Sequence, residues 1–87
     1  MSKNPLSFER DIRPLFRTID INHMFPFGVF LVDYAYMGDP SDDYRNARRV
    51  FERLTGTVTP RMPPGGPVWT ADMLLSYEQW MADGFLP

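Results

Sequence analysis

Three stretches of the chain carry apolar side chains at the spacing of an α-helix. The first stretch contains four of them: Ile12, Leu15, Phe16 and Ile19. Their spacing predicts a helix over residues 7–19 with one apolar face. Pro14 fits this prediction if the main helix begins at Asp11, because a missing N–H costs little in a first turn.

The second stretch has a clearer start. Asp39 is placed to cap a helix, and Pro40 occupies the first helical position, where proline is favoured. Apolar side chains then follow one face, at Tyr44, Ala47, Val50, Phe51 and Leu54. Gly56 is a typical terminator, so the pattern predicts a helix over residues 40–54.

The third stretch lies near the end of the chain. Thr70 precedes it and is expected to cap its first turn, and Gly84 is expected to end it. The apolar face combines Leu74, Tyr77 and Met81 with Met73 and Trp80.

The two segments between these stretches lack helical periodicity. Residues 20–38 are interrupted by Pro26 and Gly28, and we expect an irregular, apolar loop there, or a short helical turn. Residues 56–69 hold four prolines and cannot form a regular element. The sequence therefore predicts an all-α fold with about three main helices in an orthogonal arrangement, forming a single domain over residues 1–87.

Composition narrows the chemistry. The chain has 87 residues, of which 44% are hydrophobic and 15% aromatic, so it is too apolar to be disordered. The absence of cysteine excludes disulfides, zinc–thiolate sites, iron–sulfur clusters, thiol catalysis and thioether attachment of haem. A formal net charge of −2 argues against general affinity for nucleic acids, which requires an excess of basic residues.

The chain shows no targeting pattern. Residues 1–5 lack the apolar core of a signal peptide. The longest apolar run, residues 24–32, is shorter than the roughly 20 residues of a membrane span and contains proline and glycine. We therefore expect a cytoplasmic protein without a membrane partner.

Two segments carry a resemblance to a known family. The first is residues 7–16, Ser-Phe-Glu-Arg-Asp-Ile-Arg-Pro-Leu-Phe, and the second is residues 61–67, Arg-Met-Pro-Pro-Gly-Gly-Pro, followed by a helix that runs through Trp80 to Gly84. In this order they resemble class I cytochromes c, especially bacterial haem domains of multidomain redox proteins. By that resemblance, Met62 stands at the position of the distal haem ligand.

The haem-attachment motif of that family is missing. Where Cys-x-x-Cys-His would stand, the chain has Asp-Ile-Asn-His-Met over residues 20–24, with Met24 in place of the ligand histidine. The resemblance therefore implies a haem-less member. An empty slot of that size is very unfavourable in a close-packed interior, so we expect side chains to fill it, namely Phe25, Phe27, Phe30 and Leu31.

Two weak candidate sites remain. His23, Met24 and Met62 form a nitrogen and sulfur set suited to copper(I), or to haem held without a covalent bond. The alternative is that His23 is an ordinary polar residue and the methionines fill gaps in the core. Asp33 stands in an apolar stretch, where burial would make it a candidate acid–base group; alternatively, it bonds backbone N–H groups.

Apolar side chains beyond the needs of a small core suggest a binding surface, because aromatic residues and methionine are enriched at interfaces. The candidates are Phe25, Phe27, Phe30, Tyr34, Tyr36 and Met37. The alternative for Tyr34, Tyr36 and Met37 is that they pack inside the fold. We therefore expect an accessory protein-interaction module without catalysis or a cofactor. Its partner would be a redox or biosynthetic enzyme, or a second copy of the chain. The alternatives are a small copper or haem carrier, and a ligand-binding protein or enzyme that uses the vacated haem pocket.

Overall fold

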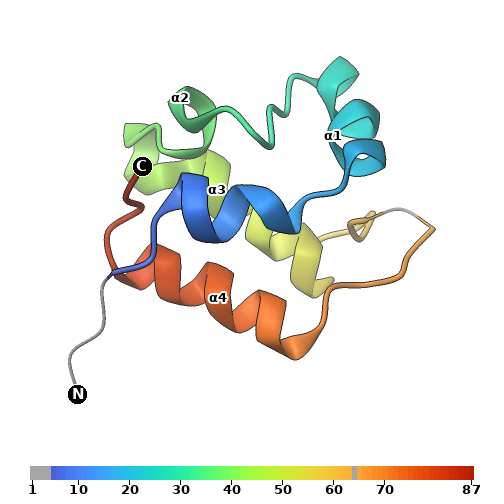
Figure 1. Cartoon of the computed structure of the whole chain (residues 1–87). Helices are drawn as coiled ribbons and strands as arrows, with labels where there is room; N and C mark the ends of the chain where they lie inside the picture. The colour runs from blue at the N-terminus through green and yellow to red at the C-terminus, as the bar shows by residue number, and fades with distance from the viewer. Residues whose placement is uncertain (1–4, 64) are drawn as a thin grey trace.

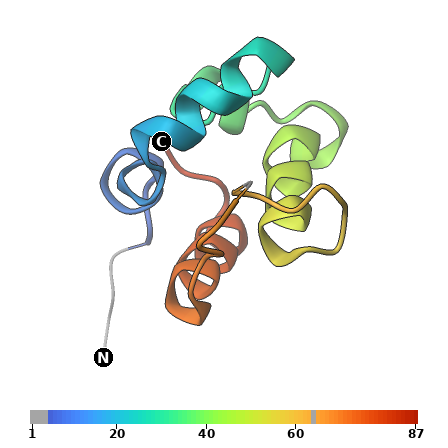
Figure 2. The same ribbon diagram turned by 90° about the vertical axis from the view of Figure 1, so that its right-hand side faces the viewer.

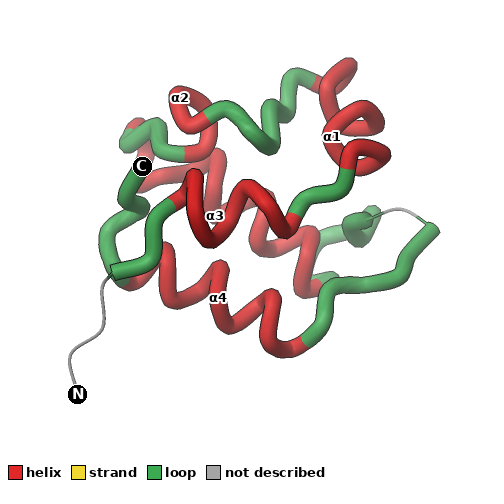
Figure 3. The backbone as a smooth tube through the Cα atoms, viewed as in Figure 1, coloured by secondary structure: helices red, strands yellow, loops and turns green. Residues whose placement is uncertain are grey.

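The computed structural model describes residues 5–63 and 65–87, and helices of three kinds make up its regular structure (Figures 1 and 3). The α-helices are α1 (Thr18–Met24), α2 (Tyr34–Met37), α3 (Ser41–Thr55) and α4 (Ala71–Ala82). A π-helix, η1 (Phe8–Ile12), and two 3₁₀-helices, η2 (Arg13–Leu15) and η3 (Phe25–Phe27), complete the set. Within the described ranges no residue belongs to a strand, which confirms the all-α class.

The single helix predicted over residues 7–19 is wrong. Ser7 caps η1, η2 follows, and the chain then leaves helical geometry at Phe16 (φ −86°, ψ 131°) before α1 begins. Pro14 explains the break, because its ring lacks an N–H and clashes with the carbonyl four residues earlier in a continuous α-helix. The break lets Phe16 pack on Trp69, with ring centroids 5.2 Å apart, and it leaves Ile19 66% exposed.

Residues 20–38 are more helical than predicted. A capping arrangement at Arg17 and Asp20 starts α1, which runs to Met24 and passes directly into η3. A separate turn, α2, is capped by the side chain of Asp33. The irregular path is thus confined to residues 28–33, because short polar side chains supply the missing hydrogen-bond partners at both helix starts.

Helix α3 matches its predicted range closely. Its buried residues Ala47, Val50 and Leu54 follow the predicted face, and Gly56 ends it in a left-handed conformation (φ 84°). Its first turn is unusual, since residues 42–44 have φ between 55° and 59°. Left-handed geometry costs about 1–2 kcal/mol per residue. Stacking of Tyr44 on Phe85, with centroids 3.9 Å apart, offsets part of that cost.

Helix α4 supplies the centre of the core. Thr70 caps it as predicted, accepting a hydrogen bond from the backbone N–H of Met73 at 3.2 Å. Tyr77 and Trp80 are completely buried. The Tyr77 hydroxyl donates to the carbonyl of Ala47 at 2.8 Å and so joins α4 to α3.

Helix α4 lies on one side of the fold and makes its main contacts with two other elements. Segment η1 and helix α3 both pack against α4, and α2 packs on α3 (Figures 1 and 2). Leu31, from the irregular segment, and Met37, from α2, complete the buried cluster. None of the helices in the described ranges is long and apolar enough to cross a membrane.

Candidate functional site

The most exposed aromatic side chains lie between α1 and α2. Phe25 is 63% exposed, Phe27 is 70% exposed and Phe30 is 37% exposed. The prediction that these three rings fill a haem-sized volume in the core is wrong; of the predicted residues, only Leu31 is buried. The reason is local: Pro26 sets a 3₁₀ turn and Gly28 reverses the chain with φ 75°, so the turn stays outside a core that other residues already close.

These exposed rings hold one another in place. The centroids of Phe25 and Phe30 are 5.3 Å apart, and Phe30 meets Tyr36 edge-on at 5.6 Å. Phe27 lies 5.9 Å from the ring of His23. Each such aromatic pair stabilises its arrangement by about 0.5–1.5 kcal/mol beyond area burial. We call Phe25, Phe27 and Phe30 the aromatic turn, and its rings form a preorganised apolar surface.

The rest of the predicted interaction surface is not open. Met37 is completely buried, because α2 turns it into the core. Tyr34 is half-buried and its hydroxyl donates to the carbonyl of Phe85 at 2.6 Å. Tyr36 is half-buried and offers only its edge, next to Phe30. Desolvation raises the pKa of both Tyr34 and Tyr36. The surface predicted from the sequence is therefore reduced to the aromatic turn and the edge of Tyr36.

A pocket of about 380 Å³ lies beside the aromatic turn. It is bordered by the end of α1, by η3, by the last turns of α3 and by the described part of residues 56–69, which we call the proline-rich loop. The lining residues are His23, Met24, Phe27, Val29, Arg53, Pro60, Arg61 and Met62. We call it the His23–Met62 pocket. The three residues predicted as a soft ligand set therefore line one cavity, although Met62 is far from His23 and Met24 in the sequence.

The donors in this pocket differ in accessibility. His23 is exposed, Met24 is half-buried and Met62 is 5% exposed. Imidazole and thioether are donors that suit copper(I), and histidine with methionine is also an axial pair for haem iron. The donor types therefore fit both groups. The described residues contain no cluster of three or more histidine, cysteine or carboxylate side chains placed to bind a metal ion.

Two arginines stand in the wall of the same pocket. Arg53 lies on the last turns of α3, and its guanidinium donates to the carbonyl of Pro60 at 3.2 Å. The side chain of Arg61 lies against Gly56, where an added Cβ would be 3.2 Å from its Cδ. No ion pair formed among the described residues includes either arginine. Sequence reasoning missed both, because only the folded chain brings the loop to the helix end.

An ion pair between the exposed Arg17 and the buried Asp20 supports α1 next to the pocket. The carboxylate of Asp20, 5% exposed, accepts hydrogen bonds from the backbone N–H of Arg17 at 3.1 Å and from its guanidinium at 3.0 and 2.9 Å. The Arg17 guanidinium lowers the pKa of Asp20, and this outweighs the opposing effect of burial. Arg17 also reaches the carbonyl of Gly66 at 3.5 Å, which ties α1 to the proline-rich loop.

The burial that would make Asp33 a candidate acid–base group is not observed. Its side chain is exposed, and it accepts a hydrogen bond from the backbone N–H of Ala35 at 2.9 Å. It does not line the His23–Met62 pocket. The alternative interpretation of Asp33, as a group that satisfies backbone N–H donors, is the one the structure bears out.

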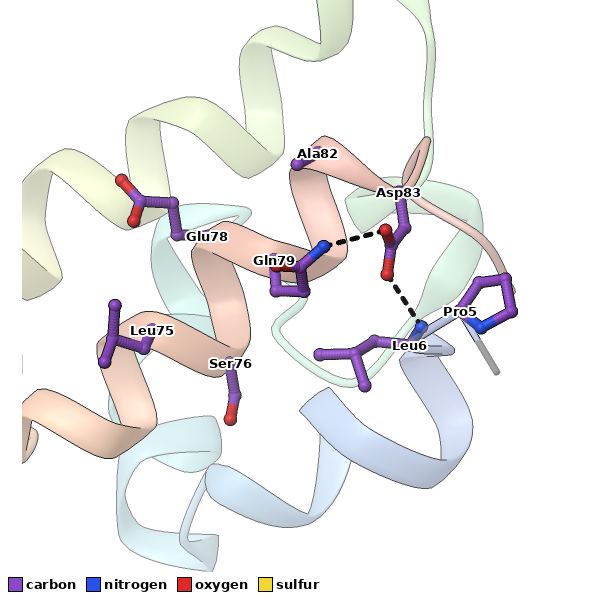
Figure 4. Close-up of a pocket in the computed structure, with 8 residues that line it drawn as sticks. All are labelled: Pro5, Leu6, Leu75, Ser76, Glu78, Gln79, Ala82 and Asp83. Carbon is purple, nitrogen blue, oxygen red and sulfur yellow. Dashed lines mark hydrogen bonds between the residues drawn. The ribbon is translucent and has the colours of Figure 1, made fainter. Parts of the chain in front are cut away.

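A second, more open hollow lies between the N-terminal segment and α4 (Figure 4). Two hydrogen bonds join residues labelled in Figure 4, and the Asp83 carboxylate is the acceptor in both. One donor is the backbone N–H of Leu6 and the other is the Gln79 side chain, each at 2.9 Å. These bonds fasten the chain near its start to the end of α4. The Asp83 carboxylate is therefore committed to holding the fold.

Comparison of the chain with protein-family models, with curated proteins and with solved structures finds no match in any of the three.

Proposed function

We propose that this chain is a non-catalytic interaction module that binds another protein through its aromatic turn. One observation carries the proposal: Phe25 and Phe27 are 63% and 70% exposed on a turn shaped by proline and glycine, outside a closed core. Aromatic side chains are enriched at protein interfaces and frequently dominate their binding energy. Burial of one such ring is worth about 1.5–3 kcal/mol, which a partner would recover.

The partner we propose is a larger redox or biosynthetic enzyme. This part rests on the resemblance of residues 7–16 and 61–67 to class I cytochromes c, whose haem domains occur within multidomain redox proteins. In the same proposal the chain is a haem-less relative that retains a docking face. A different protein is preferred to a second copy because the arginines near Phe27 favour an acidic surface, and the turn itself carries no acid.

The test is a double substitution, Phe25→Ser with Phe27→Ser, in the full chain. Capture of partner proteins from the native host, quantified by mass spectrometry, is expected to fall at least tenfold, because two anchors worth more than 1.4 kcal/mol together are lost. Leu75→Ser is the matched control: Leu75 is 60% exposed, but it lies on α4 beside the other hollow. It should leave capture unchanged.

Equal capture by the two variants would contradict the proposal, as would a loss confined to Leu75→Ser. Light scattering distinguishes an enzyme partner from a second copy of the chain. A stable dimer of the wild-type chain that the double substitution dissociates would replace the enzyme partner with a second copy of the chain.

The shared location of His23, Met24 and Met62 supports a second candidate, a small copper(I) or haem carrier. The interaction module predicts purified protein without a Soret band and without stoichiometric copper. Absorbance spectra and metal analysis measure both. A Soret band, or one copper per chain, that disappears in both His23→Ala and Met62→Leu would favour the carrier instead.

A further inference from the structure

The His23–Met62 pocket combines apolar walls with cationic groups. Five of its lining side chains are apolar: Met24, Phe27, Val29, Pro60 and Met62. The volume of about 380 Å³ falls in the range of small-molecule sites, about 300–1,000 Å³. Such walls suit a hydrocarbon or aromatic group, and thioether side chains adapt to its shape.

The polar groups of the pocket all favour an anion. Arg53 and Arg61 are permanently charged, and a guanidinium has five donors arranged to meet a carboxylate. Only one acceptor, the Pro60 carbonyl, engages the Arg53 guanidinium among the described residues. His23 adds a further ring nitrogen that can donate. No carboxylate lines the pocket.

The acidic groups of α1 and α3 do not cancel this charge. Glu52, which directly precedes Arg53, lines a separate hollow with Phe51 and Glu78. Asp20, which lies on α1 between Arg17 and His23, is already paired with the guanidinium of Arg17 at 2.9 Å. Asp42 and Asp43 lie at the opposite end of α3 from Arg53 and pair with Arg45 and Arg48. The C-terminal dipole of α3 supplies only a partial negative charge near Arg53. A chain with a net charge of −2 therefore presents a locally positive, apolar pocket.

We propose that the His23–Met62 pocket binds a small amphiphilic carboxylate. The tail occupies the space between Met24, Phe27 and Met62. The carboxylate lies at the rim and accepts hydrogen bonds from Arg61 and from the remaining donors of Arg53. The pocket shares Phe27 with the aromatic turn, whereas Phe25 and Phe30 do not line it.

Three probes of equal chain length test the charge preference: octanoate, octan-1-ol and octylamine, each titrated into the ¹⁵N-labelled full chain. Octanoate is expected to give saturable amide shifts at His23, Met24, Val29 and Met62. Octan-1-ol should bind at least tenfold more weakly, because a hydrogen bond between a guanidinium and a carboxylate is stronger than one to a neutral hydroxyl. Octylamine should bind more weakly still.

Two arginine variants test the rim. Arg61→Gln is expected to weaken octanoate at least tenfold while leaving the unliganded spectrum folded, since the Arg61 side chain is exposed. Arg45→Gln is the matched control at the far end of α3, and Phe25→Ser is the control for the aromatic turn; both should bind octanoate like the wild type.

The proposal is overturned if octanoate gives no saturable shift, if its shifts fall on α4, if octylamine binds equally well, or if Arg61→Gln binds as tightly as Arg45→Gln. If Phe25→Ser still binds octanoate, the outcome of the octanoate titration does not depend on the outcome of the capture experiment. Either proposal can then fail while the other holds.

Discussion

Replacing Trp80 with alanine is expected to lower the free energy of unfolding by about 3–5 kcal/mol. Trp80 is completely buried, and its ring meets those of Phe8, Tyr77 and Phe85 at 5.6, 5.3 and 5.2 Å. Its indole N–H also donates to the carbonyl of Leu86 at 2.8 Å. A domain of this size has roughly 4–13 kcal/mol of stability in total, so most of it is at stake. Urea denaturation followed by circular dichroism measures the loss.

Phe27→Ala is the matched control for this prediction. It also removes a large aromatic ring, but from a side chain that is 70% exposed. Its cost should stay within about 1.5 kcal/mol, the upper value for its contact with the His23 ring, and so well below that of Trp80→Ala. If the two substitutions cost the same, or if Phe27→Ala costs more, the placement of the aromatic turn outside the core is wrong.

Replacing Asp20 with alanine is expected to cost about 2 kcal/mol. The substitution removes the acceptor for three hydrogen bonds from Arg17 and leaves the start of α1 without its cap. It also releases the link between Arg17 and Gly66, so α1 and the proline-rich loop should become more mobile. Urea denaturation gives the energy, and amide hydrogen exchange over residues 18–24 locates it.

The pH dependence of the free energy of unfolding serves as the control for Asp20→Ala. The pKa of Asp20 is lowered in the folded chain by Arg17, whereas an unfolded aspartate has a pKa of about 3.9. The stabilising pair is therefore fully present above the unfolded value and is lost as the pH falls through the folded value. The difference between wild type and Asp20→Ala should be constant near neutral pH and shrink in strongly acidic solution. A difference that grows on acidification would contradict the ion pair.

Local signals in the sequence account for two of the helices. The alternating faces of α3 and α4, the cap at Thr70 and the stop at Gly56 all follow from side chains within a few residues of each other. The same reasoning failed at Pro14, because the spacing of Ile12, Phe16 and Ile19 fits a continuous helix that the proline ring interrupts.

The outward placement of the aromatic turn could not be read from the sequence. Apolar composition indicates which side chains favour burial, but it does not indicate which of them the core can accommodate. The buried cluster is formed by other residues, among them Phe8, Leu31, Met37 and Phe85, and Phe25 and Phe27 stay at the surface. This competition depends on contacts between distant parts of the chain.

The candidate site was predictable only in part. His23, Met24 and Met62 were grouped by the chemistry of their donors, and the structure places them around one pocket. Arg53 and Arg61 were missed, because nothing in their local sequence indicates that the end of α3 and the proline-rich loop border the same cavity. They change the ligand preference of the pocket toward anions.

The most direct test of the interaction module is to map where a captured partner binds. The ¹⁵N-labelled chain, titrated with that partner, is expected to show its largest amide shifts and line broadening at residues 23–30, with α4 unaffected over residues 71–82. A footprint centred on α4, with residues 23–30 unchanged, would contradict the account.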